Sequence, residues 1–288
     1  MKGPQTMQTQ FDWSIASVEA RPSLQYFVGA HRPHWLALSS QSLFVSHRTL
    51  RGRRSLPVAR APWALDSGGF SELSLFGEWQ TTPREYVAAV RRYASEIGKL
   101  EFASQQDWMC EPKMIARTGL SIEEHQRRTI ANYLELCELA PELPWMPVIQ
   151  GWTLIDYARH VEQWQAAGVE LDRLPRVGVG SICRRDSTHA TSHVLHWLAA
   201  DGIRIHAFGA KVAALRSSGG LIASADSMAW SYAARREARQ VAAWTEGAPK
   251  TGGQNRLETA LEWYAERIEP LIASGFCAET GATLPRAA

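Results

Sequence analysis

The sequence of 288 residues has little cysteine, little lysine and no long apolar run. Its four cysteines, Cys110, Cys137, Cys183 and Cys277, show no CxxC spacing, so they form neither a zinc framework nor a secreted disulfide scaffold. No apolar stretch approaches the roughly 20 residues that a membrane helix needs. The polar N-terminus does not resemble a signal peptide. We therefore expect a cytoplasmic protein without a membrane anchor.

An excess of charge of one sign is also missing. The formal net charge is +2, which excludes a polycation that binds nucleic acid through its overall charge. Most of the 31 basic residues are arginine, the side chain better suited to bidentate contacts with phosphate. Any nucleic-acid site must therefore be local.

Short apolar runs alternate with amphipathic helical segments after a polar arm over residues 1–20. Eight runs have the length and composition of buried strands: 26–30, 43–46, 64–67, 100–103, 146–150, 176–180, 204–209 and 221–226. This alternation predicts parallel strands joined by helices. We expect one α/β domain over residues 21–288, folded as a (β/α)8 TIM-type barrel.

Two connections lack a regular helical pattern. Residues 48–61 are basic and contain proline, and residues 211–220 span barely two helical turns. The barrel should therefore be irregular between strands two and three and between strands seven and eight. Helical periodicity over 228–246 and 257–272 predicts further helices at the C-terminus.

Carboxylates close two of the predicted strands, at Asp66 and Asp226. In barrels of this kind the active site lies at the C-terminal ends of the strands. Two carboxylates facing one cavity suit substitution at an anomeric carbon, since one attacks or stabilises the oxocarbenium-like centre and the other handles the proton of the leaving group. A structural turn at Asp66 and a helix cap at Asp226 are the alternatives. We expect both residues to be catalytic.

Further polar residues at strand ends could read a purine base. Asp107 and Gln150 offer the acceptors and donors that a purine edge requires, although a buried polar network would explain them equally well. Gly180 ends a glycine-rich strand, where backbone amides could approach a carbonyl such as purine O6. Ser67 and Gly151 are adjacent to strand-end residues and complete the candidate base-binding set.

Five motifs resemble the tRNA-guanine transglycosylase superfamily and are most similar to its compact DpdA-type branch, which is implicated in placing 7-deazaguanine bases into DNA. They occur in the order DSGGF at 66–70, QDWMCEP at 106–112, PVIQGW at 147–152, GVGSICRR at 178–185 and SADSMAW at 224–230. The resemblance implies that Asp226 displaces guanine and holds a covalent intermediate, and that Asp66 is the acid and base. It also implies that Asp107, Gln150 and Gly180 hold the base, with a 7-deazaguanine such as preQ0 entering.

One part of the superfamily pattern is missing. Members that act on tRNA resemble one another in a CxCxxC plus histidine zinc site after the nucleophile, whereas this chain has only Cys277 and no histidine beyond Asp226. We expect no zinc and no other cofactor. DNA is therefore the expected substrate, with tRNA as the alternative and accessory modification proteins as further partners.

Contacts to the nucleic acid can also be assigned as candidates. Arginines that follow strands two and six are candidates for phosphate contacts, unless these loops are merely solvated: Arg51, Arg53, Arg54, Arg184 and Arg185. A base in a duplex must be flipped out before it can react, so a flanking aromatic side chain is expected. Phe70, Trp108 and Trp152 follow strand ends and are candidates for stacking.

Two other functions fit parts of the sequence. A metal-dependent hydrolase is suggested by His31, His34, His206 and Asp226, but the middle strands lack the additional histidines of a binuclear site. A noncatalytic subunit that binds nucleic acid or a partner enzyme is the other alternative. The HQRRT segment at 125–129 receives no catalytic role, because helical His and Arg more often pack or pair with neighbouring loops.

Overall fold

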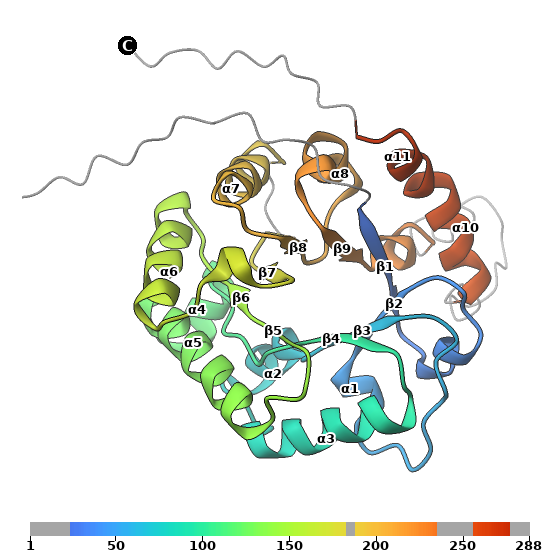
Figure 1. Cartoon of the computed structure of the whole chain (residues 1–288), viewed down its shortest axis with the longest axis horizontal. Helices are drawn as coiled ribbons and strands as arrows, with labels where there is room; N and C mark the ends of the chain where they lie inside the picture. The colour runs from blue at the N-terminus through green and yellow to red at the C-terminus, as the bar shows by residue number, and fades with distance from the viewer. Residues whose placement is uncertain (1–23, 183–187, 235–255, 277–288) are drawn as a thin grey trace, which may run out of the picture.

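The computed structural model describes residues 24–182, 188–234 and 256–276. In these ranges, parallel strands form one nine-stranded sheet in the order β5-β4-β3-β2-β1-β9-β8-β7-β6. Figure 1 looks along the ring that these strands form and shows the larger helices outside it. The predicted TIM-type barrel is confirmed.

The strand bounds agree with the predicted apolar runs to within a few residues, except in the fifth. The strands are β1 Gln25–Ala30, β2 Leu43–Ser46, β3 Trp63–Asp66, β4 Leu100–Ser104, β5 Trp145–Met146, β6 Val148–Ile149, β7 Val177–Val179, β8 Ile205–Ala207 and β9 Ser224–Ser227. The helices between them are α1 His47–Leu50, α2 Gly69–Phe76, α3 Pro83–Glu96, α4 Pro112–Thr118, α5 Ile122–Leu139, α6 Leu154–Ala166, α7 Thr188–Ala200 and α8 Val212–Ser218.

Pro147 divides the fifth predicted strand into β5 and β6. Proline has no N–H group to donate to a ladder, but its carbonyl accepts a hydrogen bond from Gly178 N at 2.8 Å. β5 pairs with β4, and β6 pairs with β7. Because β5 and β6 are the two ends of the strand order, Pro147 joins them and closes the ring. The prediction of eight continuous strands was wrong at this point.

The predicted irregular connections are confirmed. Only the four residues of α1 form a helix between β2 and β3, and α8 with the 3-10 turn Gly219–Leu221 joins β8 to β9. At the C-terminus, α10 Leu257–Arg267 and α11 Glu269–Ala273 replace the one helix predicted over 257–272. The break at Ile268 has a local cause, because Pro270 has no N–H group to continue the α10 ladder.

Parts of the prediction lie outside the described residues. These are the polar arm over 1–20 and the end of the helix predicted over 228–246, of which residues 229–234 are described and helical. Among the described helices, none has the length and apolar character needed to cross a membrane.

Side chains fill the barrel interior in layers. At the N-terminal end, Arg176 Nη2 donates to Glu101 Oε1 at 2.9 Å and to Gln25 Oε1 at 2.8 Å. Above this polar layer, inward side chains form an apolar cluster of Phe27, Phe44, Ala64, Phe102 and Met146. Alternate residues point outward and pack against the helices, as a strand period of two requires. The carboxylates and amides at the strand ends are thereby left at the opposite, C-terminal mouth.

Candidate active site

Asp66 is the last residue of β3 and Asp226 the last but one of β9, and the two strands β1 and β2 lie between β3 and β9 in the sheet. Burial raises the pKa of Asp66, and the charge of Asp226 adds to the rise, against hydrogen bonds from the Ser46 side chain and the Gly68 backbone. The two aspartates are therefore close enough to interact electrostatically. A carboxyl group with a raised pKa beside a second carboxylate is typical of acid and base catalysis.

Asp226 is held through one of its two carboxylate oxygens. Oδ1 accepts a hydrogen bond from Gly209 N at 3.0 Å and lies 3.4 Å from His206 Nε2. His206 is fully buried, and burial lowers its pKa, so its ring is neutral at pH 7. Oδ2 makes no hydrogen bond to any residue that the structure describes. One oxygen is thus oriented by the barrel while the other can approach a substrate.

Asp107, Gln150 and Ser181 form a hydrogen-bonded chain at the ends of β4, β6 and β7. Gln150 Nε2 donates to Asp107 Oδ2 at 2.5 Å, and Ser181 Oγ donates to Gln150 Oε1 at 2.7 Å. These two bonds fix the orientation of the glutamine amide. Burial raises the pKa of Asp107 to about 7, where the Gln150 hydrogen bond opposes the rise and the charge of Asp66 adds to it.

The backbone after β7 is shaped around Gln150. A Cβ atom on Gly180 would lie 2.1 Å from Gln150 Nε2, so any side chain there would displace the amide. Ser181 has a φ of 56°, an unfavourable conformation for a non-glycine residue. Gly180 N donates to Ile149 O at 3.0 Å, so this amide is engaged in the barrel. The contact of Gly180 with a base stays a prediction. In the structure, the missing side chain of Gly180 leaves space for the Gln150 amide.

The sequence matches the model of the family DpdA, described as DeoxyPurine in DNA protein A, over residues 23–273. The chain belongs to the DpdA family. Membership confirms the resemblance drawn from the five motifs. It gives the chain a role in the modification of DNA with 7-deazaguanine bases, as an enzyme of the transglycosylase type with DNA as its substrate.

Two solved structures are similar to this DpdA chain. A protein from Coccidioides immitis assigned as a fructose-1,6-biphosphate aldolase aligns with 11% identity and a TM-score of 0.48, covering 88% of this chain and 90% of its own. A protein from Sinorhizobium meliloti assigned as an isomerase aligns with 12% identity and a TM-score of 0.38, covering 72% and 51%. No curated protein matches the sequence. Since both TM-scores are below 0.5, the fold assignment depends on the strand order and pairing given above.

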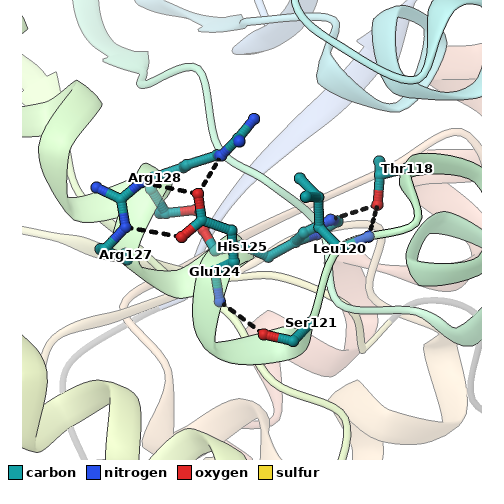
Figure 2. A network of polar contacts seen from close by, with 8 residues as sticks. Thr118, Leu120, Ser121, Glu124, His125, Arg127 and Arg128 are labelled. Carbon is teal, nitrogen blue, oxygen red and sulfur yellow. Dashed lines mark hydrogen bonds and ion pairs between the residues drawn. The ribbon is translucent and has the colours of Figure 1, made fainter.

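The inner face of α5 holds the loops that carry Asp107 and Gln150. Thr129 Oγ1 accepts a hydrogen bond from Trp108 N at 2.9 Å, and His125 Nδ1 lies 2.7 Å from Met109 O. Gln126 Nε2 donates to the backbone oxygen of Gln150 at 2.8 Å. Figure 2 shows His125 reaching from α5 to Thr118, whose Oγ1 lies 2.7 Å from His125 Nε2.

These helix residues are the part of the DpdA site that the sequence interpretation missed. His125, Gln126 and Thr129 are each at most 1% exposed. A signal was present, because three polar residues at positions i, i+1 and i+4 occupy the helix face that the apolar residues Ile130 and Tyr133 place toward the core. Buried polar side chains need partners, and here the partners are the strand-end loops.

The stacking candidates differ in how open they are. Phe70 and Trp108 pack in one apolar cluster with Leu73, Met109 and Met114. The guanidinium of Arg128 lies 4.6 Å from the centre of the Trp108 ring. Trp152 is partly exposed, and its backbone N donates to Asp156 Oδ2 at 3.1 Å. Stacking on a base stays a prediction for all three aromatic residues.

The phosphate candidates are only partly available. Arg51 Nη1 forms an ion pair with Oε1 of Glu72, a buried residue of α2, at 3.0 Å. Arg53 and Arg54 are exposed, and Arg53 Nε donates to Thr49 O at 2.8 Å. Their contact with DNA stays a prediction. The remaining two candidates, Arg184 and Arg185, lie outside the described residues.

Ser67 and Gly151 are both enclosed. Ser67 is 1% exposed, and its Oγ has no hydrogen-bond partner among the described residues. A Cβ atom on Gly151 would lie 2.8 Å from Tyr157 N, so the glycine lets the chain turn closely into α6. The structure brings both residues to the mouth of the barrel, and their contact with the base stays a prediction.

The histidines considered for a metal-dependent hydrolase do not come together with Asp226 as a set. His31 Nε2 lies 3.1 Å from Ser231 Oγ, and His34 is exposed at the surface. Only His206 contacts Asp226. In the described ranges, no group of three or more His, Cys, Asp or Glu residues could hold a metal ion. That the enzyme uses no zinc or other cofactor stays a prediction.

Proposed function

We propose that this DpdA-family chain replaces guanine in DNA with a 7-deazaguanine base such as preQ0, through a covalent intermediate on Asp226. The target nucleotide leaves the duplex stack before it reaches the mouth. Asp226 Oδ2 then attacks C1′, the bond from C1′ to N9 breaks, and the departing guanine takes a proton from Asp66. Guanine leaves the site before the second displacement.

In the second displacement, the incoming base loses its N9 proton to the Asp66 carboxylate. N9 attacks C1′, and the ester bond between C1′ and Asp226 breaks. Two inversions retain the configuration at C1′, and Asp66 returns to its protonated form. The raised pKa of Asp66 supports this alternation, because the group must be protonated in one step and ionised in the next.

Asp107 and Gln150 suit the recognition of both bases. Guanine and 7-deazaguanine present the same N1–H, amino and O6 groups, and they differ at position 7. The Asp107 carboxylate accepts hydrogen bonds from N–H groups, and the Gln150 amide can donate to O6. An enzyme that exchanges these bases must bind the groups that both of them share. The alternative to exchange, hydrolysis, would need water at C1′ in place of the second base.

The observation that carries the proposal is the arrangement around Asp226. Its Oδ1 is fixed by Gly209, its Oδ2 is unbonded to the described chain, and Asp66 with a raised pKa lies within electrostatic range. A nucleophile and a proton carrier at one mouth are what base displacement at C1′ requires.

The decisive experiment compares the wild type with Asp226→Asn in the incorporation of a labelled 7-deazaguanine into DNA. We expect incorporation, and a protein–DNA adduct on a denaturing gel, only with the wild type. Asp201→Asn is the matched control, because Asp201 is exposed and precedes β8 at the opposite end of the barrel. Wild-type incorporation by Asp226→Asn would refute the mechanism. Incorporation into tRNA and not into DNA would refute the substrate.

A further inference from the structure

The outer face of α5 carries two adjacent arginines that are oriented by one glutamate. Arg127 Nη2 and Arg128 Nε lie 2.7 Å and 2.6 Å from Glu124 Oε1, and Arg127 Nε donates to Glu124 Oε2 at 2.7 Å. Figure 2 shows Glu124 between the two guanidinium groups. Glu124 is itself fixed at the start of the helix, because its backbone N donates to Ser121 Oγ at 3.2 Å.

Arg128 is held from a second direction by an aromatic ring. Its guanidinium lies over Trp108, which follows Asp107 in the same loop. A guanidinium between a carboxylate and a ring loses much of its freedom before any ligand binds. No hydrogen bond to the described chain uses the two terminal nitrogens, Nη1 and Nη2, of Arg128. The side chain is thus pre-oriented, and part of its hydrogen-bonding capacity remains.

The position of α5 places this pair on the active-site side of the barrel. The inner face of the same helix holds the loops that end in Asp107 and Gln150. The nearby Arg159–Glu123 contact at 3.9 Å adds one charge of each sign, so three arginines face two glutamates and leave one net positive charge. The arginine side chains remain reachable, at 66% exposed for Arg127 and 37% for Arg128.

We propose that Arg127 and Arg128 contact the phosphate backbone of DNA beside the target nucleotide. The inference rests on the proposed function only for the identity of the ligand as DNA. Arginine donors that are already oriented fit phosphate oxygens, and contacts of this kind set the register of the strand over a site. A strand held at this face would present its extruded base toward Asp107, across Trp108.

The test is the salt dependence of binding to a short fluorescein-labelled single-stranded DNA oligonucleotide, measured by anisotropy. On single-stranded DNA, each lost phosphate contact should reduce the magnitude of the slope of log K against log salt by about 0.7, measured between about 50 and 200 mM salt. We expect Arg127→Ala to lower the slope by one such step, and Arg127→Ala with Arg128→Ala by two, with about tenfold weaker binding for each.

Two further variants distinguish the loss of positive charge at this site from a general effect of removing an arginine. The double variant Arg127→Lys and Arg128→Lys keeps both charges, so it should retain most of the slope. Arg173→Ala is the matched control, because Arg173 forms the same type of i, i+3 pair with Glu170, at 2.8 Å, but precedes β7 at the opposite end of the barrel. Wild-type slopes in the alanine variants, or equal losses in the lysine and alanine variants, would overturn the proposal. The assay needs no base exchange, so a wild type that binds DNA without exchanging bases would refute only the proposed function.

Discussion

The charged side chains at the two ends of the barrel differ in whether they form ion pairs. At the N-terminal end, Arg176 is paired with Glu101, and Gln25 Nε2 donates to Glu101 Oε2 at 2.6 Å. The Arg176 guanidinium also lies 4.6 Å from the centre of the Phe102 ring. At the mouth, by contrast, neither Asp66 nor Asp107 nor Asp226 forms an ion pair with a lysine or arginine of the described chain.

This difference distinguishes ion-paired residues, which stabilise the fold, from the carboxylates that we propose to be catalytic. The Arg176–Glu101 ion pair covers the apolar layer at the N-terminal end of the barrel, and removing one partner leaves a partly buried charge without compensation. Burial raises the pKa values of Asp66 and Asp107, and ionising either carboxyl group therefore lowers the stability of the folded state. Proteins tolerate such a loss at sites where reactivity depends on it. Substitutions at the two ends should therefore have opposite effects on activity and stability.

The largest effect on activity should come from Asp66→Asn at the mouth. We expect the single-turnover rate of base exchange to fall by about a thousandfold, or about 4 kcal/mol, because the departing guanine receives no proton. The free energy of unfolding at pH 8 should not fall, since the folded state already favours the neutral form of this group. Urea unfolding of the same samples checks this. A rate within tenfold of the wild type, or a large loss of stability, would contradict the role of Asp66.

At the N-terminal end of the barrel, Arg176→Met should lower stability and leave the exchange rate nearly unchanged. We expect the free energy of unfolding to fall by about 2 kcal/mol, because Glu101 loses its partner while the methionine retains contact with the Phe102 ring. Urea unfolding measures the loss, and the exchange rate of the folded enzyme should change by less than about threefold. Adding Glu101→Met should restore part of the stability, since it removes the uncompensated charge. A fall in rate without a fall in stability would break the comparison.

The positions of Asp66 and Asp226, the candidate catalytic residues, could be predicted because the C-terminal ends of all strands in a parallel barrel lie at the same mouth. Apolar runs ending in Asp66 and Asp226 define strands, and parallel strands bring their C-terminal ends to one mouth. The divided fifth strand was harder to see. Pro147 lies inside one apolar run, and only the pairing partners on its two sides show that β5 and β6 separate there.

The support of the site could not be predicted in the same way. Gln126 and Gln150 are linked by a hydrogen bond between a helix side chain and a strand-end carbonyl, and sequence spacing does not specify such a contact. The backbone amide of Gly180 is a second example of a contact that the sequence does not specify. The glycine-rich strand end predicts backbone amides that a carbonyl could approach, and in the structure the N–H group of Gly180 donates to Ile149 O. Whether a backbone group is free depends on the register of the neighbouring strand.

The smallest of these effects should be a pH dependence of base binding that originates at Asp107. Its pKa of about 7 means that the side chain is neutral below that pH, and a neutral carboxyl group accepts fewer hydrogen bonds from guanine. The KM for the entering base should be constant above pH 7 and should rise by about tenfold for each pH unit below it. Because the pKa of Asp107 is raised in the folded state, the same group should destabilise the fold progressively from pH 4 to about 7.

Asp107→Asn separates this titration from that of Asp66. The variant cannot ionise, so its KM should be higher than that of the wild type above pH 7 and independent of pH. Its melting temperature at pH 8 should exceed that of the wild type by a few degrees, since no buried charge has to form. Steady-state kinetics and thermal melts across the same buffers measure both. If the KM of Asp107→Asn still rose below pH 7, the titrating group would be Asp66 or the base itself, and the mouth would contain one functional proton site in place of two.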